Sequence, residues 1–219
     1  MPIFALSKEL HFPPVDQAQY NGLLAIGGDL SPERLLLAYK NGIFPWYSGE
    51  TILWWSPDPR FVLYPESLNV SSSIKKFFRK NIYDFTIDTS FSEVIHHCKT
   101  IQRTGQDGTW ITDDIEKAYI KMHELGYAHS AETWKDGKLI GGMYGIRLGK
   151  IFFGESMFSL LDNASKFAFI NYIEKLKKDN VKLIDCQVYT EHLESLGAEM
   201  IPRSEFVHIL KLGVVSGEW

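Results

Sequence analysis

Three runs of strand-forming residues follow one another between residues 128 and 157, and only two very short turns separate them. The first turn reads Lys-Asp-Gly at residues 135–137, and the second reads Leu-Gly at residues 148–149. Asp-Gly pairs and glycine-containing tight loops are typical of the turns that join antiparallel strands. The spacing therefore predicts an antiparallel meander whose strands cover residues 128–134, 139–147 and 150–157.

Helices are expected before and after this meander in the sequence, because apolar residues recur at helical spacing between N-cap residues and glycine stops. Thr112 is an expected N-cap, and Ser90 with Glu93 forms a capping-box pattern. The predicted helices cover residues 70–80, 90–99, 112–125, 163–178, 191–196 and a last segment from 204. Further strands are expected over residues 60–64, 84–87 and 182–188. This order predicts an α+β domain of the acyl-CoA N-acyltransferase (GNAT-like) type over residues 61–219.

Residues 1–60 differ from the rest, because they are rich in proline and show little continuous periodicity. One short helix is expected after Ser31, with Pro32 at its first position and Gly42 beyond its end. The segment is predicted to be a small, loop-rich N-terminal domain.

Composition limits the function classes. The chain has 219 residues, 45% of them hydrophobic, so it can bury a substantial core. No secretory signal pattern begins it, and no apolar run approaches the roughly 20 residues that cross a bilayer. We therefore expect a soluble, cytoplasmic protein with no membrane partner. A formal net charge of −4 argues against broad coating of nucleic acid and leaves room for a local basic patch.

Polar residues inside two predicted strands are the first candidates for chemistry. Glu155 ends the third meander strand beside a glycine, where a ligand can approach the backbone. Asp185 and Gln187 are two apart in an apolar strand, so alternation places them on one face and Ile184 and Cys186 on the other. Two alternatives stay open, a solvent-facing Glu155 and a satisfied buried pair of Asp185 and Gln187.

Aromatic and basic clusters suggest nucleic-acid contacts. Trp46, Trp54, Trp55 and Trp110 lie in loop-rich segments, where flat rings can stack on bases or simply hold a small domain together. One predicted helix carries four cations, which are candidate phosphate contacts or a solvated face: Lys75, Lys76, Arg79 and Lys80.

Several other chemistries lack their signature in the sequence. Cys98 and Cys186 are too few and too far apart for a metal-ligand motif, and we expect both to be reduced. The histidines show no zinc-binding spacing, and no phosphate-binding loop or nucleophile-elbow motif occurs.

Long segments that match one known family lie along the chain, and they include residues 21–32, 42–46, 54–60, 141–145, 154–159, 163–166 and 183–187. Through these segments the chain resembles, nearly end to end, the bacterial leucyl/phenylalanyl-tRNA–protein transferase family. The resemblance implies transfer of Leu or Phe, with Met a third candidate, from aminoacyl-tRNA to the α-amine of a protein with N-terminal Arg or Lys. Such a product is marked for degradation by the N-end rule. No metal or cofactor is implied, and a monomer is expected.

The resemblance also assigns roles to individual residues. Asp185, Gln187 and Glu155 match the catalytic residues: Asp185 and Gln187 match the pair that acts on the attacking amine, and Glu155 matches the carboxylate beside the reacting centre. Four residues match the pocket for the aminoacyl side chain: Met143, Phe169, Tyr172 and Ile184. Four aromatic residues match those around the 3′-terminal adenosine of the tRNA: Trp46, Trp110, Tyr39 and Tyr119.

Two other functions remain as alternatives. An acetyl-CoA-dependent N-acyltransferase would need a glycine-rich loop whose amides hold pyrophosphate, and none precedes residue 163. A non-catalytic tRNA-binding module would keep the tryptophans and lysines but would not need Asp185 and Gln187.

Overall fold

A computed structural model describes residues 3–102 and 109–215 of the chain. Its larger part is a seven-stranded sheet in the order β11-β5-β10-β9-β8-β7-β6. All neighbours in this sheet are antiparallel except β9 and β10, which are parallel. The strands are β5 (Arg60–Leu63), β6 (Asp84–Ile87), β7 (Ala128–Lys135), β8 (Lys138–Leu148), β9 (Ile151–Ser159), β10 (Leu183–Gln187) and β11 (Glu199–Ile201).

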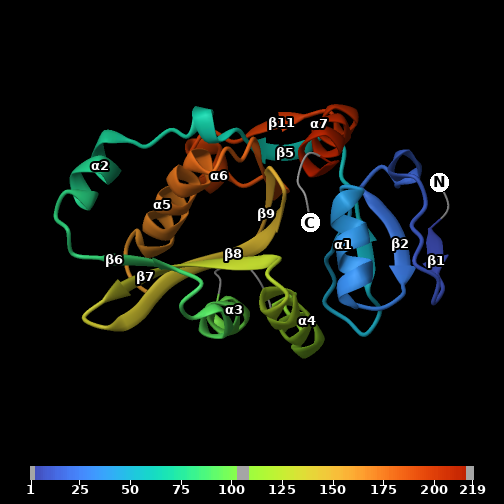
Figure 1. Cartoon of the computed structure of the whole chain (residues 1–219), viewed down its shortest axis with the longest axis horizontal. Helices are drawn as coiled ribbons and strands as arrows, with labels where there is room; N and C mark the ends of the chain where they lie inside the picture. The colour runs from blue at the N-terminus through green and yellow to red at the C-terminus, as the bar shows by residue number, and fades with distance from the viewer. Residues whose placement is uncertain (1–2, 103–108, 216–219) are drawn as a thin grey trace.

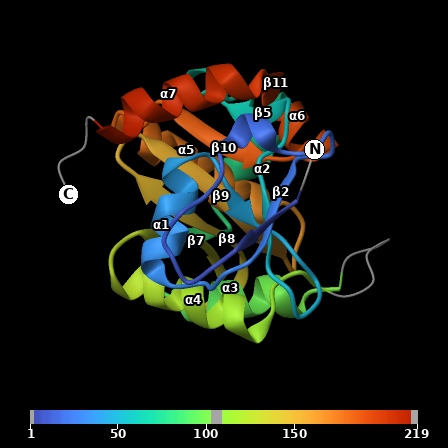
Figure 2. The same ribbon diagram turned by 90° about the vertical axis from the view of Figure 1, so that its right-hand side faces the viewer.

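Helices cover both faces of this sheet (Figure 1). The long helix α5 lies on one face of the meander, and α3 and α4 lie on the other. Helix α7 runs along the edge that carries β5 and β11, opposite α3 and α4 (Figure 2). The helices of this part are α2 (Ser72–Phe78), α3 (Phe91–Thr100), α4 (Asp113–Glu124), α5 (Ala164–Lys178), α6 (Glu191–Ser195) and α7 (Arg203–Val215).

A second, smaller sheet stands beside the first, in the order β1-β2-β4-β3. Helix α1 (Pro32–Lys40) packs between this sheet and the larger part, where it meets α4 and α7. The strands are short: β1 (Phe4–Leu6), β2 (Leu23–Gly27), β3 (Phe44–Pro45) and β4 (Leu53–Trp55). Trp54 is fully buried here and donates its indole N–H to the carbonyl of Gly27 over 2.8 Å, so it holds the small sheet together.

The predicted α+β fold class and the meander are confirmed. The first turn has Asp136 and Gly137 at φ of 51° and 71°, the positive angles that a tight two-residue hairpin needs. The Thr112 side chain accepts from the N–H of Ile115 over 3.2 Å, as expected of an N-cap.

Two local predictions were wrong or incomplete. Ser90 makes no capping hydrogen bond with its side chain, so the predicted capping box does not form. The backbone N–H of Ser90 instead points to the buried carboxylate of Glu132, 3.5 Å away. Strands β1 to β4 and β11 were not predicted, because two to five residues are too short to show a period.

Within the described residues, none of the helices combines the length and the apolar character that crossing a membrane requires.

Candidate active site

A cavity of about 380 Å³ opens where the larger sheet splits between two of its strands. Strands β9 and β10 pair only as far as Phe153 and Asp185. Beyond that point both strands turn residues into the cavity, residues 154–157 from β9 and residues 186–188 from β10 and its end. Strand β3 and the Trp46 that follows it close one side, and α5 and α6 close the other.

Two β-bulges aim the polar side chains at this cavity. The register between β8 and β9 shifts between Tyr144 and Gly145, so Glu155 is an extra residue without a partner in the ladder. The register between β10 and β5 shifts between Asp185 and Gln187. Gln187 has a φ of 65°, in the left-handed region that non-glycine residues rarely adopt. Because a bulge re-aims the side chains beside it, simple alternation does not hold at either place.

Glu155 is the centre of the polar part of the cavity. Its Oε1 accepts from the hydroxyl of Tyr39 over 2.7 Å and from the amide Nε2 of Gln187 over 2.8 Å. Its Oε2 accepts from the hydroxyl of Tyr119 over 3.1 Å. Helices α1 and α4 and strand β10 thus each direct one side chain at the carboxyl group that β9 supplies.

The hydroxyls of Tyr39 and Tyr119 also contact each other, so these groups form a closed ring with Glu155. Burial raises the pKa of Glu155 to about 7, the charge of Asp185 also raises it, and the tyrosine hydrogen bonds oppose that rise. Glu155 therefore exchanges a proton near neutral pH.

An apolar pocket continues from this polar centre. Met143 on β8, Phe169 on α5 and Ile184 on β10 all line the cavity, and these are three of the four residues that the resemblance assigns to an aminoacyl side-chain pocket. Tyr172 does not line it. Its ring is buried behind the wall, edge-on to Phe152 with ring centroids 5.1 Å apart.

Two indole rings stand where the cavity meets solvent. Trp46 and Trp110 both line it, and Trp46 is 42% exposed. The carbonyl of Trp46 accepts from the indole N–H of Trp55 over 2.6 Å, and the ring centroids of Trp46 and Trp55 lie 5.7 Å apart. Tyr39 and Tyr119, expected beside these tryptophans, are fully buried and do not line the cavity. Their hydroxyls hold Glu155 instead of facing a nucleotide.

Asp185 also lies outside the lining of the cavity. Its carboxylate is fully buried and forms two hydrogen bonds with Arg60, 2.8 Å from Nε to Oδ1 and 2.6 Å from Nη2 to Oδ2. The predicted shared face of Asp185 and Gln187 is therefore wrong. The bulge turns Gln187 to the side of Ile184, so that Gln187, Ile184 and Cys186 line the cavity together.

The predicted phosphate contacts lie elsewhere. Lys75 and Lys76 are on α2, and Arg79 and Lys80 follow it, beyond α5 from the small sheet (Figure 1). None of these four residues lines the cavity, so the structure separates the basic segment from it.

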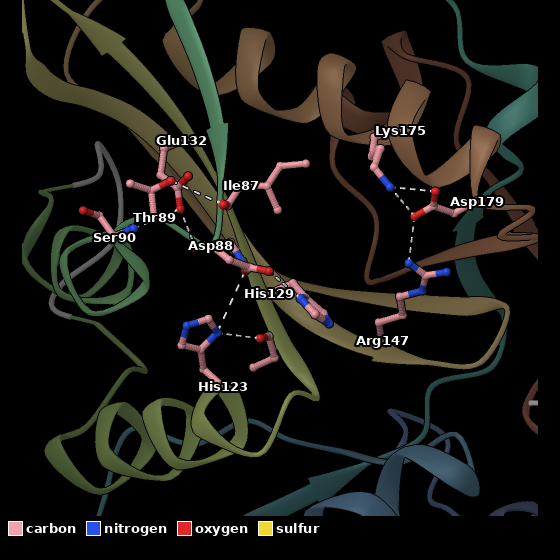
Figure 3. Close-up of polar contacts among 12 residues, drawn as sticks. Ile87, Asp88, Thr89, Ser90, His123, His129, Glu132, Arg147, Lys175 and Asp179 are labelled. Carbon is pink, nitrogen blue, oxygen red and sulfur yellow. Dashed lines mark hydrogen bonds and ion pairs between the residues drawn. The ribbon is translucent and has the colours of Figure 1, made fainter. Parts of the chain in front are cut away.

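A further polar cluster surrounds Asp88 on the α3–α4 side of the sheet (Figure 3). Its Oδ2 lies 2.8 Å from Nδ1 of His129, and its Oδ1 accepts the N–H of Ser130 over 2.8 Å. Nδ1 of His123 lies 2.8 Å from the carbonyl of Ala128 and 3.9 Å from Asp88. Across residues 3–102 and 109–215, no three His, Cys, Asp or Glu side chains are placed to hold a metal ion.

Sequence reasoning missed two residues of this region. Arg60 was placed only in a strand, although a cation at the start of the buried run Arg60–Leu63 signals a buried partner. His192 on α6 lines the cavity, and its buried Nε2 has no hydrogen-bond partner among the described residues. Burial, assisted by the charge of Lys166, lowers the pKa of His192, so this imidazole is neutral at neutral pH.

Comparisons with known proteins identify relatives that match nearly the whole chain. The family model for "Leucyl/phenylalanyl-tRNA protein transferase" matches residues 62–211, and the model for its N-terminal domain matches residues 28–58. The transferase of that name from Syntrophus aciditrophicus is 54% identical over 100% of this chain and 94% of its own. The one from Flavobacterium johnsoniae is 55% identical over 95% of this chain and 99% of its own.

Solved structures with lower similarity include L-PGS from Bacillus licheniformis, with a TM-score of 0.41 and 13% identity over 78% of this chain and 57% of that chain. Another is a GCN5-related N-acetyltransferase from Kribbella flavida, with a TM-score of 0.38 and 8% identity over 82% of this chain and 64% of that chain. Full-length identity above one half, together with the family model over most of the residues, decides the assignment. The chain belongs to the leucyl/phenylalanyl-tRNA–protein transferase family.

Proposed function

We propose that the chain transfers leucine or phenylalanine from aminoacyl-tRNA to the α-amine of a protein whose N-terminal residue is Arg or Lys. One observation carries the proposal: a single cavity joins an apolar pocket, a carboxyl group of near-neutral pKa and two indole rings at its mouth. These three features suit the three parts of an aminoacyl ester on a terminal adenosine, which are the amino-acid side chain, the reacting ester and the adenine.

The substrate fits the cavity in one direction. The aminoacyl side chain enters between Met143, Phe169 and Ile184, which are apolar and bring no polar group that would need a partner. The adenine stacks on Trp46 and Trp110 at the mouth. This placement brings the ester carbonyl beside Glu155 and Gln187, at the junction of the two regions.

The amine then attacks the ester carbon, forming the C–N bond as the C–O bond to the ribose breaks. The amine must lose a proton and the ribose oxygen must gain one. Gln187 donates its amide N–H to Glu155, which turns its carbonyl oxygen toward an attacking N–H. Glu155, with a pKa of about 7, accepts a proton from the amine and can return one to the leaving oxygen. The ester already stores the needed energy, so positioning and proton transfer suffice.

The proposal also covers the contacts with the tRNA body, the oligomeric state, the location and the domains of the chain. The basic segment Lys75, Lys76, Arg79 and Lys80 contacts the phosphates of the tRNA body, at a distance from its 3′ end. The chain acts as a monomer in the cytoplasm, where charged tRNA is present, and its product enters N-end rule degradation. Residues 1–60 and 61–219 are its two domains.

The decisive experiment mixes the protein with radiolabelled leucyl-tRNA and a peptide that begins with Arg, and then measures label in the peptide. A peptide that begins with Ala serves as the acceptor control. We expect labelled product from the first peptide only, and no inhibition by coenzyme A. Inhibition by coenzyme A would favour the acetyl-CoA alternative, and retention of intact leucyl-tRNA without transfer would favour the non-catalytic binding module.

A matched pair of variants tests the site. Gln187→Ala should lower turnover by about 100-fold while leucyl-tRNA still binds, since its amide acts on the attacking amine. Glu174→Gln, an exposed substitution on α5, should leave turnover unchanged. Normal turnover in Gln187→Ala would refute the assigned role.

A further inference from the structure

Arg60 lies behind the active cavity and has no part in the chemistry described above. Its guanidinium is fully buried, and it sits over the rings of Phe44 and Phe206 at 4.7 and 4.6 Å from their centroids. Nη1 donates to the carbonyl of Gly42 over 3.3 Å, while Nε and Nη2 bind the two oxygens of Asp185. The guanidinium is therefore held by contacts with two aromatic rings and by one hydrogen bond from each of its three nitrogens.

Asp185, held by Arg60, in turn restrains the backbone of Gln187. Its Oδ1, already bound to Nε of Arg60, accepts the N–H of Gln187 over 2.9 Å. Gln187 needs such a restraint, because its φ of 65° is unfavourable for a residue with a side chain. Without the restraint, the strand can relax to ordinary alternation, which would turn the amide of Gln187 away from the cavity.

The contacts of Asp185 also exclude a direct role for its carboxylate in proton transfer. Both oxygens face Arg60, the side chain is fully buried, and it does not line the cavity. A group that cannot reach the amine acts on it only through a neighbour.

We infer that Arg60 and Asp185 form a positioning pair, which holds the bulge of β10 so that Gln187 points at the attacking amine. The inference rests on the proposed function and adds to it a residue, Arg60, that does not line the cavity. Arg60 sets the geometry of Gln187 through two successive hydrogen bonds, and Asp185 acts on the backbone of Gln187.

The first test compares Asp185→Asn with Asp185→Ala in steady-state transfer from leucyl-tRNA to the Arg peptide. Asn keeps an oxygen that can accept the N–H of Gln187, whereas Ala removes it. We expect kcat of Asp185→Ala to be about tenfold or more below that of Asp185→Asn, with KM for leucyl-tRNA within about threefold of wild type in both. Equal loss of kcat in the two variants would overturn the inference, because loss of the charge alone would then explain it.

The second test removes the pair while keeping the interior neutral. The double variant Arg60→Met with Asp185→Leu leaves no unpaired charge, so it can fold, which circular dichroism and thermal unfolding would verify. We expect a folded protein whose kcat falls by about tenfold or more at nearly unchanged KM for leucyl-tRNA. A folded double variant with wild-type kcat would refute the inference. If it does not fold, the comparison of Asp185→Asn with Asp185→Ala decides alone.

A second Arg–Asp pair supplies the matched control. Nη1 of Arg147 on β8 lies 2.9 Å from Oδ2 of Asp179 at the end of α5, away from the cavity (Figure 3). The double variant Arg147→Met with Asp179→Leu should keep wild-type kcat. Failure of the wild-type protein to transfer leucine would refute the proposed function itself, whereas wild-type transfer that survives loss of the Arg60–Asp185 pair would refute only the positioning role.

Discussion

Glu155→Gln should make the protein less active and, above neutral pH, more stable. The pKa of Glu155 is raised from 4.5 to about 7, mainly because burial disfavours its charged form. Between these two pH values the unfolded chain loses the proton while the folded chain keeps it. The free energy of unfolding therefore falls as pH rises through this window.

The raised pKa sets the size of the effect. Each unit of pKa difference between the folded and unfolded chains corresponds to about 1.4 kcal/mol, so the whole window is worth about 3 kcal/mol. Gln at this position cannot ionise and does not lose this stability. The stability of Glu155→Gln relative to wild type should thus improve by about 3 kcal/mol between pH 4.5 and pH 7.5.

Urea unfolding followed by tryptophan fluorescence at several pH values in this range measures the difference. Glu174→Gln, exposed on α5, serves as the control and should follow the wild-type curve. The same samples should show transfer activity lowered by about 100-fold in Glu155→Gln only, since its amide cannot accept the proton of the amine. A stability difference that stays constant across the pH range would refute the half-buried, titrating carboxyl on which the proposed mechanism depends.

Three further outcomes test other parts of the structure. Met143→Trp should fill the apolar pocket and lower kcat/KM for phenylalanyl-tRNA by more than about tenfold, while filter binding of the tRNA stays near wild type; equal transfer would reject the pocket. Asp88 has a pKa lowered by His129 and the N–H of Ser130 against the opposing effect of burial, so its stabilisation is present above its ordinary pKa and is lost as pH falls. Asp88→Asn should therefore cost about 1 kcal/mol at pH 7 and progressively less toward pH 3 in urea titrations, and a cost independent of pH would contradict this. Gly145→Ala should lower the melting temperature strongly, because a Cβ there would lie 2.2 Å from a β9 carbonyl oxygen, whereas Gly49→Ala, with open space, should not; similar melting temperatures would show that the bulge is misplaced.

Local chemistry accounts for the parts of the fold that were predicted. The Asp136-Gly137 turn adopts its positive φ angles because these two residues tolerate them in any surrounding. The Thr112 hydroxyl caps helix α4 by accepting the N–H of Ile115, which lies only three residues further along the chain. Such features involve neighbours in sequence, so a single sequence contains everything that they require.

The capping box predicted at Ser90 shows where local reasoning fails. The sequence pattern paired Ser90 with Glu93, but the carboxylate near the N–H of Ser90 belongs to Glu132, in a strand 42 residues away. A long-range partner replaced the local one, which periodicity cannot reveal.

Residue types along β9 and β10 were enough to single out Glu155 and Gln187, and the resemblance supplied the pocket and the tryptophans. The orientation of these side chains was a different matter. Alternation failed at Gln187 because a bulge held by Asp185 and Arg60 overrides the period of a regular strand. The amino-acid sequence by itself determined the helices, the strands of the larger sheet except β11, the family and the kinds of group available for catalysis. Only the tertiary structure decided which of those groups meet, because the ring around Glu155 and the pair behind Gln187 join residues that are as many as 125 positions apart in the chain.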